Sequence, residues 1–214
     1  MKFIRYEQAD KTQIGILNQA GTDILPLSGL LPHRSYVTMQ ELIENITGDE
    51  LAQLKTALHT GAACPSVPAA QVKILPPIDK PIHDILCVGV NYRDHQKEAS
   101  EALNDFKAAP RAVYFAKRAI RILGDGGEIQ SRPDLDDQID YEVELAVIIG
   151  RRGKDIPKEE AENYIFGYSV FNDISSRRLQ NQHGQWFKGK SLDTYTAMGP
   201  VILHKSALPF PVEA

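Results

Sequence analysis

The sequence contains few cysteines, no excess of basic residues and no long apolar run, and each absence excludes a class of protein. Cys64 and Cys87 are the only cysteines in 214 residues, so a disulfide framework is excluded and a reducing cytoplasm is the expected location. The 24 Lys and Arg residues are outnumbered by 28 Asp and Glu residues, and the resulting net charge of −4 argues against a nucleic-acid partner. Apolar runs such as residues 145–149 are too short to span a bilayer, and residues 1–7 lack the apolar core of a secretory signal. We therefore expect a cytoplasmic protein with no nucleic-acid partner and no membrane partner.

What is present is the composition of an ordinary globular protein, with 43% hydrophobic and 24% charged residues. The length allows one large domain, or one domain with a small companion. The Pro- and Ala-rich segment 64–70 is typical of a linker, so we predict a small α+β domain over residues 1–70 and a second domain over residues 71–214. In the first domain we expect strands at 3–4, 14–17 and 24–27, a helix opened by a capping box from Thr38 to Glu41, and a second helix from Gly48 to Gly61.

The second domain is predicted to be rich in short strands. The strand candidates are residues 85–88, 112–115, 143–149, 168–171 and 201–203, with short helices near 94–103 and 157–164. Because the strands are short and outnumber the helices, a mixed β barrel or sandwich fits better than a doubly wound sheet. The predicted fold class is α+β, mostly β.

Two glutamates lie on one face of the predicted strand at 143–149 and its lead-in. Side chains alternate along a strand, so Glu142 and Glu144 point to the same side, and the opposite face is wholly apolar. Two adjacent carboxylates repel each other, and a hard divalent cation such as Mg²⁺ would relieve that repulsion. The alternative is a half-exposed strand with a solvated polar face. Asp173, which ends the next strand, is either a third carboxylate or the N-cap of a short helix.

Other charged groups leave similar alternatives open. His95 and Glu98 lie three residues apart on a predicted helix, where they form either a general-base pair or a solvated ion pair. Lys188 and Lys190 flank a glycine, and they either belong to a solvated loop or present a cation to an anionic substrate. Cys87 lies inside an apolar strand, which indicates core packing.

Taken in order, several short motifs resemble the fumarylacetoacetate hydrolase superfamily. They are VGVNYRDH (88–95), VYFAK (113–117), DYEVELAVIIG (140–150), GYSVFND (167–173), Ser176-Arg177 with Gln180, and GKSLDT (189–194) through GPV (199–201). The resemblance implies a barrel-like mixed β catalytic domain, and the N-terminal unit resembles the small variable domain that precedes it in many members. Members continue past the Gly-Pro-Val strand with segments that close the barrel. The resemblance therefore also predicts a catalytic domain that is incomplete at the C-terminus, as in a truncated member.

The resemblance assigns a metal site and a catalytic group. In the family, a Mg²⁺ or Mn²⁺ ion is held by two Glu and one Asp, which are here Glu142, Glu144 and Asp173, and Ca²⁺ can replace it in crystals. His95 and Glu98 match a pair that acts on water in some members. The remaining catalytic residue is Lys190, which matches a lysine that faces substrate oxygens.

The resemblance also implies a substrate class and a reaction. The substrate-binding side chains would be Arg177, Gln180, Tyr92 and Lys117, and the ligand a small oxo-dicarboxylic acid that chelates the ion. The implied activity is hydrolysis of a C–C bond in an acylpyruvate or fumarylpyruvate, through an enolate, as in aromatic catabolism. An oxo-acid decarboxylase and a 2-hydroxyhepta-2,4-diene-1,7-dioate-type isomerase use the same enolate, and an inactive metal-binding remnant is a further alternative. The family also implies a homodimer.

Overall fold

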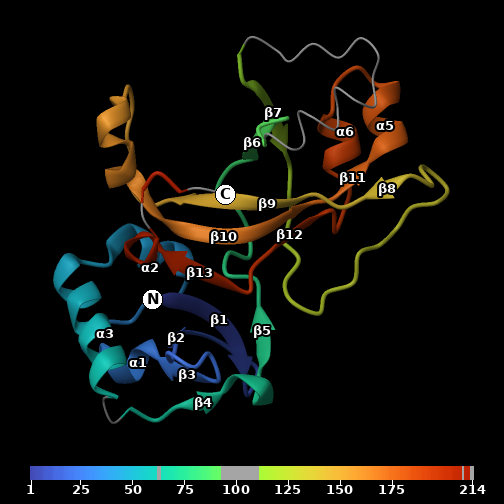
Figure 1. Cartoon of the computed structure of the whole chain (residues 1–214). Coiled ribbons are helices and arrows are strands. Elements are labelled where there is room, and N and C mark those ends of the chain that lie inside the picture. The colour runs from blue at the N-terminus through green and yellow to red at the C-terminus, as the bar shows by residue number, and fades with distance from the viewer. Residues whose placement is uncertain (62–63, 93–110, 209, 213–214) are drawn as a thin grey trace.

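The computed structural model describes residues 1–61, 64–92, 111–208 and 210–212, and within them the chain is a mixed α+β structure made mostly of strands, as predicted (Figure 1). The strands are β1 (Lys2–Gln8), β2 (Lys11–Leu17), β3 (Asp23–Pro26), β4 (Val67–Pro68), β5 (Lys73–Leu75), β6 (Ile85–Gly89), β7 (Val113–Lys117), β8 (Ile139–Asp140), β9 (Val143–Ile149), β10 (Ile165–Asp173), β11 (Ser175–Ser176), β12 (Thr196–Met198) and β13 (Val201–His204). The α-helices are α1 (Leu27–Leu30), α2 (Met39–Asn45), α3 (Gly48–Thr60), α5 (Arg177–Gln182) and α6 (Phe187–Lys190), and the 3₁₀ segments are η1 (Ala69–Gln71), η2 (Lys158–Tyr164) and η3 (Lys205–Ala207). The helix expected near residues 94–103 lies outside the described residues.

Nine of the described strands form one antiparallel sheet in the order β12-β10-β13-β1-β2-β3-β4, with β5 paired to β1 and β9 paired to β10. Separate two-stranded ribbons are formed by β6 with β7 and by β8 with β11. The order ends at β12 and at β4, so within the described ranges the strands do not close into a barrel. The sequence predicts the strand content, but not this register between distant segments.

The sheet and its core continue across the predicted domain boundary. β1 pairs with β13 from Lys2↔Leu203 to Ile4↔Val201, which joins the N-terminal strands to the C-terminal part of the sheet. β4 falls within the predicted linker and pairs with β3. One core cluster includes residues from both sides of the boundary, namely Phe3, Ile16, Leu54, Ile148, Phe166 and Ile202 among others. The division at residue 70 stays a prediction.

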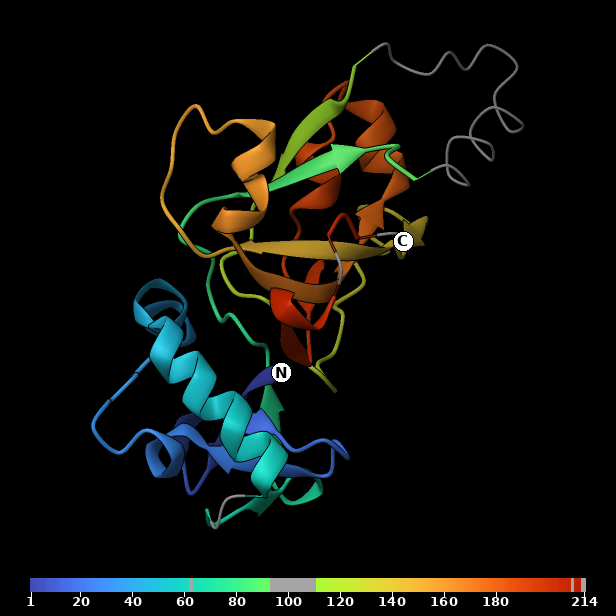
Figure 2. The same ribbon diagram turned by 60° about the vertical axis from the view of Figure 1, so that its left-hand side comes forward.

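Helices α2 and α3 begin at side-chain caps. Thr38 accepts a hydrogen bond from the Glu41 N–H, so the predicted cap of α2 is present, although the Glu41 carboxylate bonds to Val37 N–H and not to Thr38 N–H. The reciprocal capping box forms instead at the start of α3, between Thr47 and Glu50. Helix α3 lies against the N-terminal strands (Figure 2) and ends at Gly61, whose φ of 63° is the left-handed conformation that glycine adopts without strain.

Glu50 is expected to stabilise the fold at neutral pH. Its buried carboxylate accepts hydrogen bonds from the Thr47 N–H (2.9 Å), Arg34 Nε (2.6 Å) and Tyr36 hydroxyl (2.9 Å). The Thr47 N–H bond is the largest cause of a pKa lowered to about 2; burial opposes this shift, while Arg34 and Tyr36 add to it. A lowered folded-state pKa means that the stabilisation is complete above the unfolded-state pKa and is lost as the pH falls toward 2.

We therefore expect Glu50→Gln to lower the free energy of unfolding at pH 7 by roughly 2 kcal/mol. The difference from wild type should shrink below about pH 4. Urea denaturation between pH 7 and pH 3 measures both effects, with the exposed neighbour Asp49→Asn as control. If the free energies of unfolding of Glu50→Gln and wild type differed by the same amount at every pH, the stabilising role of the ionised Glu50 carboxylate would be contradicted.

No helix among the described residues combines the length and the apolar character that crossing a membrane requires.

Candidate metal and active site

Three carboxylates meet where β9 and β10 pair. Glu144 lies in β9, Glu142 comes just before that strand, and Asp173 is the last residue of β10. The antiparallel register places Phe171 opposite Glu144, and the Asp173 N–H donates to the Glu142 carbonyl oxygen (2.8 Å), so the end of β10 lies beside the start of β9. One carboxylate oxygen from each residue lies within 4.8 Å of the other two. We call these three residues the acidic triad.

Two buried lysines neutralise part of the triad. Lys117, at the end of β7, has no exposed surface, and its Nζ lies 2.7 Å from Asp173 Oδ1 and donates to the Ile174 carbonyl oxygen at 2.9 Å. Lys190 Nζ, in α6, donates to Glu142 Oε2 and Asp173 Oδ2, both at 2.8 Å. Burial lowers the pKa of Lys117, although the charge of Asp173 opposes that shift. Asp173, itself fully buried, is therefore held between two ammonium groups.

Glu144 lacks such compensation. Among the described residues, no Lys, Arg or His forms an ion pair with its carboxylate. Burial, followed by the charges of Asp173 and Glu142, raises the pKa of Glu144 to about 7. Glu144 is thus the one carboxylate of the triad that forms no ion pair with a cation of the described residues.

The triad fits a hard divalent cation. Carboxylate oxygens are the ligands that Mg²⁺, Mn²⁺ and Ca²⁺ prefer, and three converging carboxylates are a suitable donor set. Asp173 Oδ1 is buried and accepts no hydrogen bond of good geometry from the described residues, although the Lys117 ammonium lies close by. An additional cation at the triad would satisfy this oxygen and the Glu144 carboxylate together.

The predicted substrate-binding residues Arg177 and Gln180 lie beside the triad on α5. The Arg177 guanidinium donates to Asp140 Oδ2 (Nη2, 2.7 Å) and lies 2.6 Å from Glu142 Oε1. A third bond, from Nη1 to Gln180 Oε1 (3.1 Å), links the two side chains to each other. Asp140 was not singled out from the sequence as a site residue. The sequence does contain a pattern that points to Asp140, because side chains alternate along a strand and Asp140 therefore lies on the same face as Glu142 and Glu144.

Tyr92 lines a cavity beside the triad, whereas Lys117 lies in the protein interior. The Tyr92 hydroxyl oxygen accepts a hydrogen bond from the Leu145 N–H (3.0 Å) at the side of β9 that does not face β10. Tyr92, Glu144 and Leu145 line a cavity of about 740 Å³ whose other walls are largely apolar. Lys117 contacts Asp173 within the protein interior and is absent from the described lining of that cavity. His95 and Glu98 lie outside the described residues.

The structure excludes one alternative each for Asp173 and Lys190, and it agrees with the prediction that Cys87 is buried. Asp173 does not cap α5, because the N-cap of that helix is Ser176. Lys190 does not belong to a solvated loop, since it is 2% exposed and lies in α6. Cys87 is buried as expected, and burial together with the carboxylates of Asp173 and Glu144 raises the pKa of its thiol to about 12, so the thiol stays neutral.

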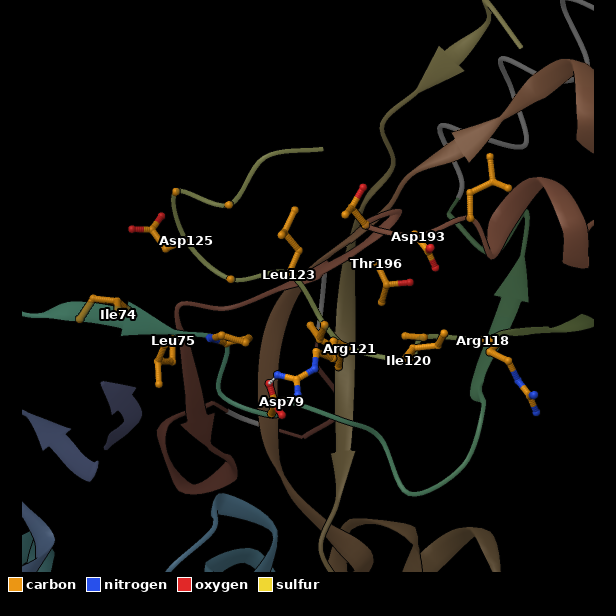
Figure 3. A pocket seen from close by; sticks show the side chains of 18 of the residues that line it. Ile74, Leu75, Asp79, Arg118, Ile120, Arg121, Leu123, Asp125, Asp193 and Thr196 are labelled. Carbon is orange, nitrogen blue, oxygen red and sulfur yellow. Dashed lines mark ion pairs between the residues drawn. The ribbon is translucent and has the colours of Figure 1, made fainter. Parts of the chain in front are cut away.

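A second cavity, of about 690 Å³, lies among β5, residues 118–127 and residues 191–196 (Figure 3). Figure 3 shows Arg121 turned toward Asp79, with which it forms an exposed ion pair at 3.8 Å. None of the predicted site residues is among the described residues that line this cavity. The candidate site is therefore the triad and the first cavity.

Gly189 is expected to be essential for placing Lys190. A Cβ atom at this position would lie 2.7 Å from Gln180 N and 2.8 Å from the Ser176 carbonyl oxygen, both of them backbone atoms that cannot rotate away. Gly189→Ala should therefore push α6 from α5, move Lys190 from the triad and destabilise the fold by about 1–3 kcal/mol. Thermal unfolding measures the loss of stability. Gly184→Ala is the control for the Cβ contact, because no atom lies within 4 Å of its added Cβ and its cost comes from the positive φ of +64° alone. Equal stability of Gly189→Ala and wild type would contradict the close packing of α5 and α6.

Comparisons with known proteins identify relatives in sequence and in fold. The oxaloacetate tautomerase YisK of Bacillus subtilis is 46% identical over 143 residues, which cover 66% of this chain and 46% of that protein. An uncharacterized protein of Staphylococcus aureus (strain USA300) is 32% identical, with 99% of this chain and 72% of that protein covered. The solved fumarylacetoacetate hydrolase of Exiguobacterium antarcticum has a TM-score of 0.74 at 33% identity and covers 98% of this chain and 68% of its own. The chain thus spans less than half the length of the tautomerase and about two thirds of the solved hydrolase.

The family match covers most of the chain, including every residue of the triad. Residues 84–213 match the family described as "Fumarylacetoacetate (FAA) hydrolase C-terminal". The predicted family and the predicted α+β fold class are thereby confirmed. The chain belongs to the fumarylacetoacetate hydrolase family of enzymes.

Proposed function

We propose that the protein catalyses a divalent-metal-dependent keto–enol tautomerisation of a short 2-oxo dicarboxylic acid such as oxaloacetate. The observation that carries the proposal is the convergence of three carboxylates at the end of β10, two of which contact buried ammonium groups. Such a site can bind a cation and, next to it, an anion. The 46% identity to a protein named oxaloacetate tautomerase supports this choice of reaction.

Each residue of the site has a distinct part in this proposal. Glu142, Glu144 and Asp173 would hold Mg²⁺ or Mn²⁺, and the ion would supply Lewis acidity that favours the enolate of a 2-oxo acid. Lys190 has three N–H donors, of which Glu142 and Asp173 accept two, and its ammonium lies 5.2 Å from the centre of the Phe115 ring. Among the described residues one donor therefore has no hydrogen-bond acceptor, and it would serve the oxygen that becomes negative.

Substrate orientation and proton transfer complete the reaction. Arg177 and Gln180 would orient the substrate carboxylate, since a guanidinium binds carboxylates through parallel hydrogen bonds. His95, with Glu98 as the carboxylate partner that the family resemblance implies, would accept the proton from the carbon next to the carbonyl group, and the imidazolium would then return this proton to the carbonyl oxygen to give the enol. No bond between carbon atoms breaks, and no other reactant is consumed.

Hydrolysis of a C–C bond in an acylpyruvate is the second candidate. It is favoured by the 33% identity and the TM-score of 0.74 to the solved fumarylacetoacetate hydrolase. In this reaction His95 would take the proton from water, which attacks the distant carbonyl group, and the C–C bond breaks to leave an enolate that is then protonated. Both reactions need the triad, but only hydrolysis consumes water.

An assay of the purified full chain separates the two candidates. The protein is supplied with Mg²⁺ or Mn²⁺, the decay of enol oxaloacetate is followed by its ultraviolet absorbance, and cleavage of acetylpyruvate is followed in parallel. Metal ions alone accelerate enolisation, so the metal without protein and the metal with Glu144→Gln protein are the controls. We expect protein-dependent tautomerisation that EDTA abolishes and that His95→Ala reduces by about 100-fold or more. Metal-dependent cleavage without tautomerisation would support hydrolysis, and the absence of both activities would contradict the proposed function.

A further inference from the structure

Asp136 is a buried carboxylate that lies outside the acidic triad. It is 3% exposed, whereas its neighbour Asp137 is exposed and pairs with Arg178 on the surface. A buried carboxylate is costly unless its oxygens are hydrogen-bonded. Within the described part of the chain Asp136 forms no ion pair, and its partners are all uncharged N–H and O–H groups.

Two of these partners, Ser176 and Leu179, belong to the residues that open α5, and the third is Gln138. Asp136 Oδ2 accepts hydrogen bonds from the Ser176 hydroxyl and from the Leu179 N–H (3.1 Å), and Oδ1 accepts from the Gln138 N–H at 2.7 Å. Burial acts to raise the pKa of Asp136, but the bonds from Ser176 and from the backbone N–H groups lower it below its usual value. The carboxylate is therefore an ionised acceptor for the first turn of the helix.

Helix α5 depends on this external acceptor. Its N-cap, Ser176, makes no side-chain bond to its own helix and instead donates its hydroxyl to Asp136. A helix of six residues is too short to be stable by itself. The Asp136 oxygen thus replaces the ordinary N-cap, because it accepts the Leu179 N–H that would otherwise be without a partner.

The helix that Asp136 fixes carries the side chains proposed to bind substrate. Arg177 is its first residue, and Gln180 lies one turn later. Helix α6 packs directly on the same turn through Gly189, and the next residue, Lys190, contacts the triad. The triad itself comes from β9, its lead-in and β10, so α5 supplies none of its carboxylates.

We propose that Asp136 is a positioning residue for substrate binding, which fixes the first turn of α5 so that Arg177 and Gln180 face the ligand of the metal site. The inference rests on the proposed function, because it takes a 2-oxo acid anion as that ligand. The helix supplies no carboxylate to the triad and reaches it through the Arg177–Glu142 contact (2.6 Å), so loss of Asp136 is expected to lower substrate affinity much more than metal affinity.

The test compares Asp136→Ala, Asp136→Asn and the matched surface variant Asp137→Asn in the full chain. Calorimetric titration measures the affinity for Mn²⁺ first, and then the affinity for oxalate, a planar dicarboxylate probe, at saturating Mn²⁺. For Asp136→Ala we expect oxalate affinity to fall about tenfold or more while Mn²⁺ affinity stays within about twofold of wild type. Asp136→Asn keeps one oxygen acceptor, so its oxalate affinity should fall by only about threefold, and Asp137→Asn should match wild type.

The outcomes are distinguishable. Equal oxalate affinity in Asp136→Ala and wild type would overturn the role of Asp136 and leave the proposed function intact. A parallel loss of Mn²⁺ affinity would also overturn it, because Asp136 would then support the whole site. If the wild type binds Mn²⁺ but no oxalate, the proposed function fails, and the substrate role of Asp136 fails with it.

Two milder variants test the proposal if Asp136→Ala does not fold. If circular dichroism shows that Asp136→Ala is unfolded, Asp136→Asn and Ser176→Ala decide, since each removes only part of the cap. Both should then raise the KM for oxaloacetate by about threefold or more, with kcat and Mn²⁺ affinity unchanged. A fall in kcat at constant KM in both variants would overturn the proposal.

Discussion

Lys117→Met is expected to destabilise the protein by about 3–5 kcal/mol, one of the two largest effects that the structure predicts. Lys117 and Asp173 are both fully buried, with their charged atoms 2.7 Å apart. Removal of the ammonium group leaves the Asp173 carboxylate with Lys190 as its remaining cation among the described residues, and leaves the Ile174 carbonyl oxygen without this donor. The methionine fills similar space, so the loss reports the charge and not a cavity.

Urea denaturation measures this effect at pH 7, with Lys154→Met, a variant of a 90% exposed lysine, as the control. The double variant Lys117→Met/Asp173→Asn should recover part of the loss, because it removes the unpaired buried charge. Stability within about 0.5 kcal/mol of wild type in Lys117→Met would contradict the buried pair. If that variant also lost oxalate binding, Lys117 would be a substrate ligand, as the family resemblance implies.

Glu144→Gln is expected to be more stable than wild type in the metal-free protein and less stable than wild type when Mn²⁺ is bound. In the metal-free protein, the pKa of Glu144 is raised to about 7 by burial and by the charges of Asp173 and Glu142. A raised folded-state pKa of an acid means that the fold loses stability as the pH rises from the unfolded-state pKa, near 4.5, toward 7. The neutral glutamine avoids this loss, so at pH 7.5 the metal-free variant should be more stable than wild type by about 1–2 kcal/mol, after allowance for solvent screening.

With Mn²⁺ at 100 times its Kd, the wild type should gain about 2.7 kcal/mol and become the more stable of the two. Thermal unfolding of EDTA-treated and Mn²⁺-loaded samples between pH 5 and pH 8 tests both signs. Glu160→Gln, which changes an exposed carboxylate on η2, should show neither effect. A lower metal-free stability of Glu144→Gln at pH 7.5 would contradict the uncompensated charge.

Local patterns in the sequence predict most of the elements and the shared face of two of the three triad residues. The alternation along β9 places Glu142 and Glu144 on one face, and this requires knowledge of no other segment. The position of Asp173 beside them requires the β9–β10 register, which is a contact between distant residues. The sequence therefore leaves open whether Asp173 is a carboxylate ligand or a helix cap. The structure excludes the cap, because Ser176 is the N-cap of α5, and the ligand role stays a prediction.

Contacts between segments that are distant in the chain also explain where the structure differs from the other sequence predictions. β4 was predicted as linker because its partner, β3, lies about forty residues earlier in the chain. The burial of Lys190 depends on the approach of Gly189 to α5, and the importance of Asp136 depends on a bond to Leu179, 43 residues away. Neither feature has a periodic signal, since both arise from packing between segments, and Gly189 and Lys190 are marked in the sequence only by the family motif at 189–194.

We expect the acidic triad to bind one divalent cation, and a Mn²⁺ titration of EDTA-treated protein tests this expectation most directly. Calorimetry or electron paramagnetic resonance should show one tight site per chain in wild type. Glu144→Gln should lower the affinity by about 100-fold or more, because it removes a charged ligand but no ion pair, whereas Glu160→Gln should bind like wild type. Unchanged affinity and stoichiometry in Glu144→Gln would contradict the account.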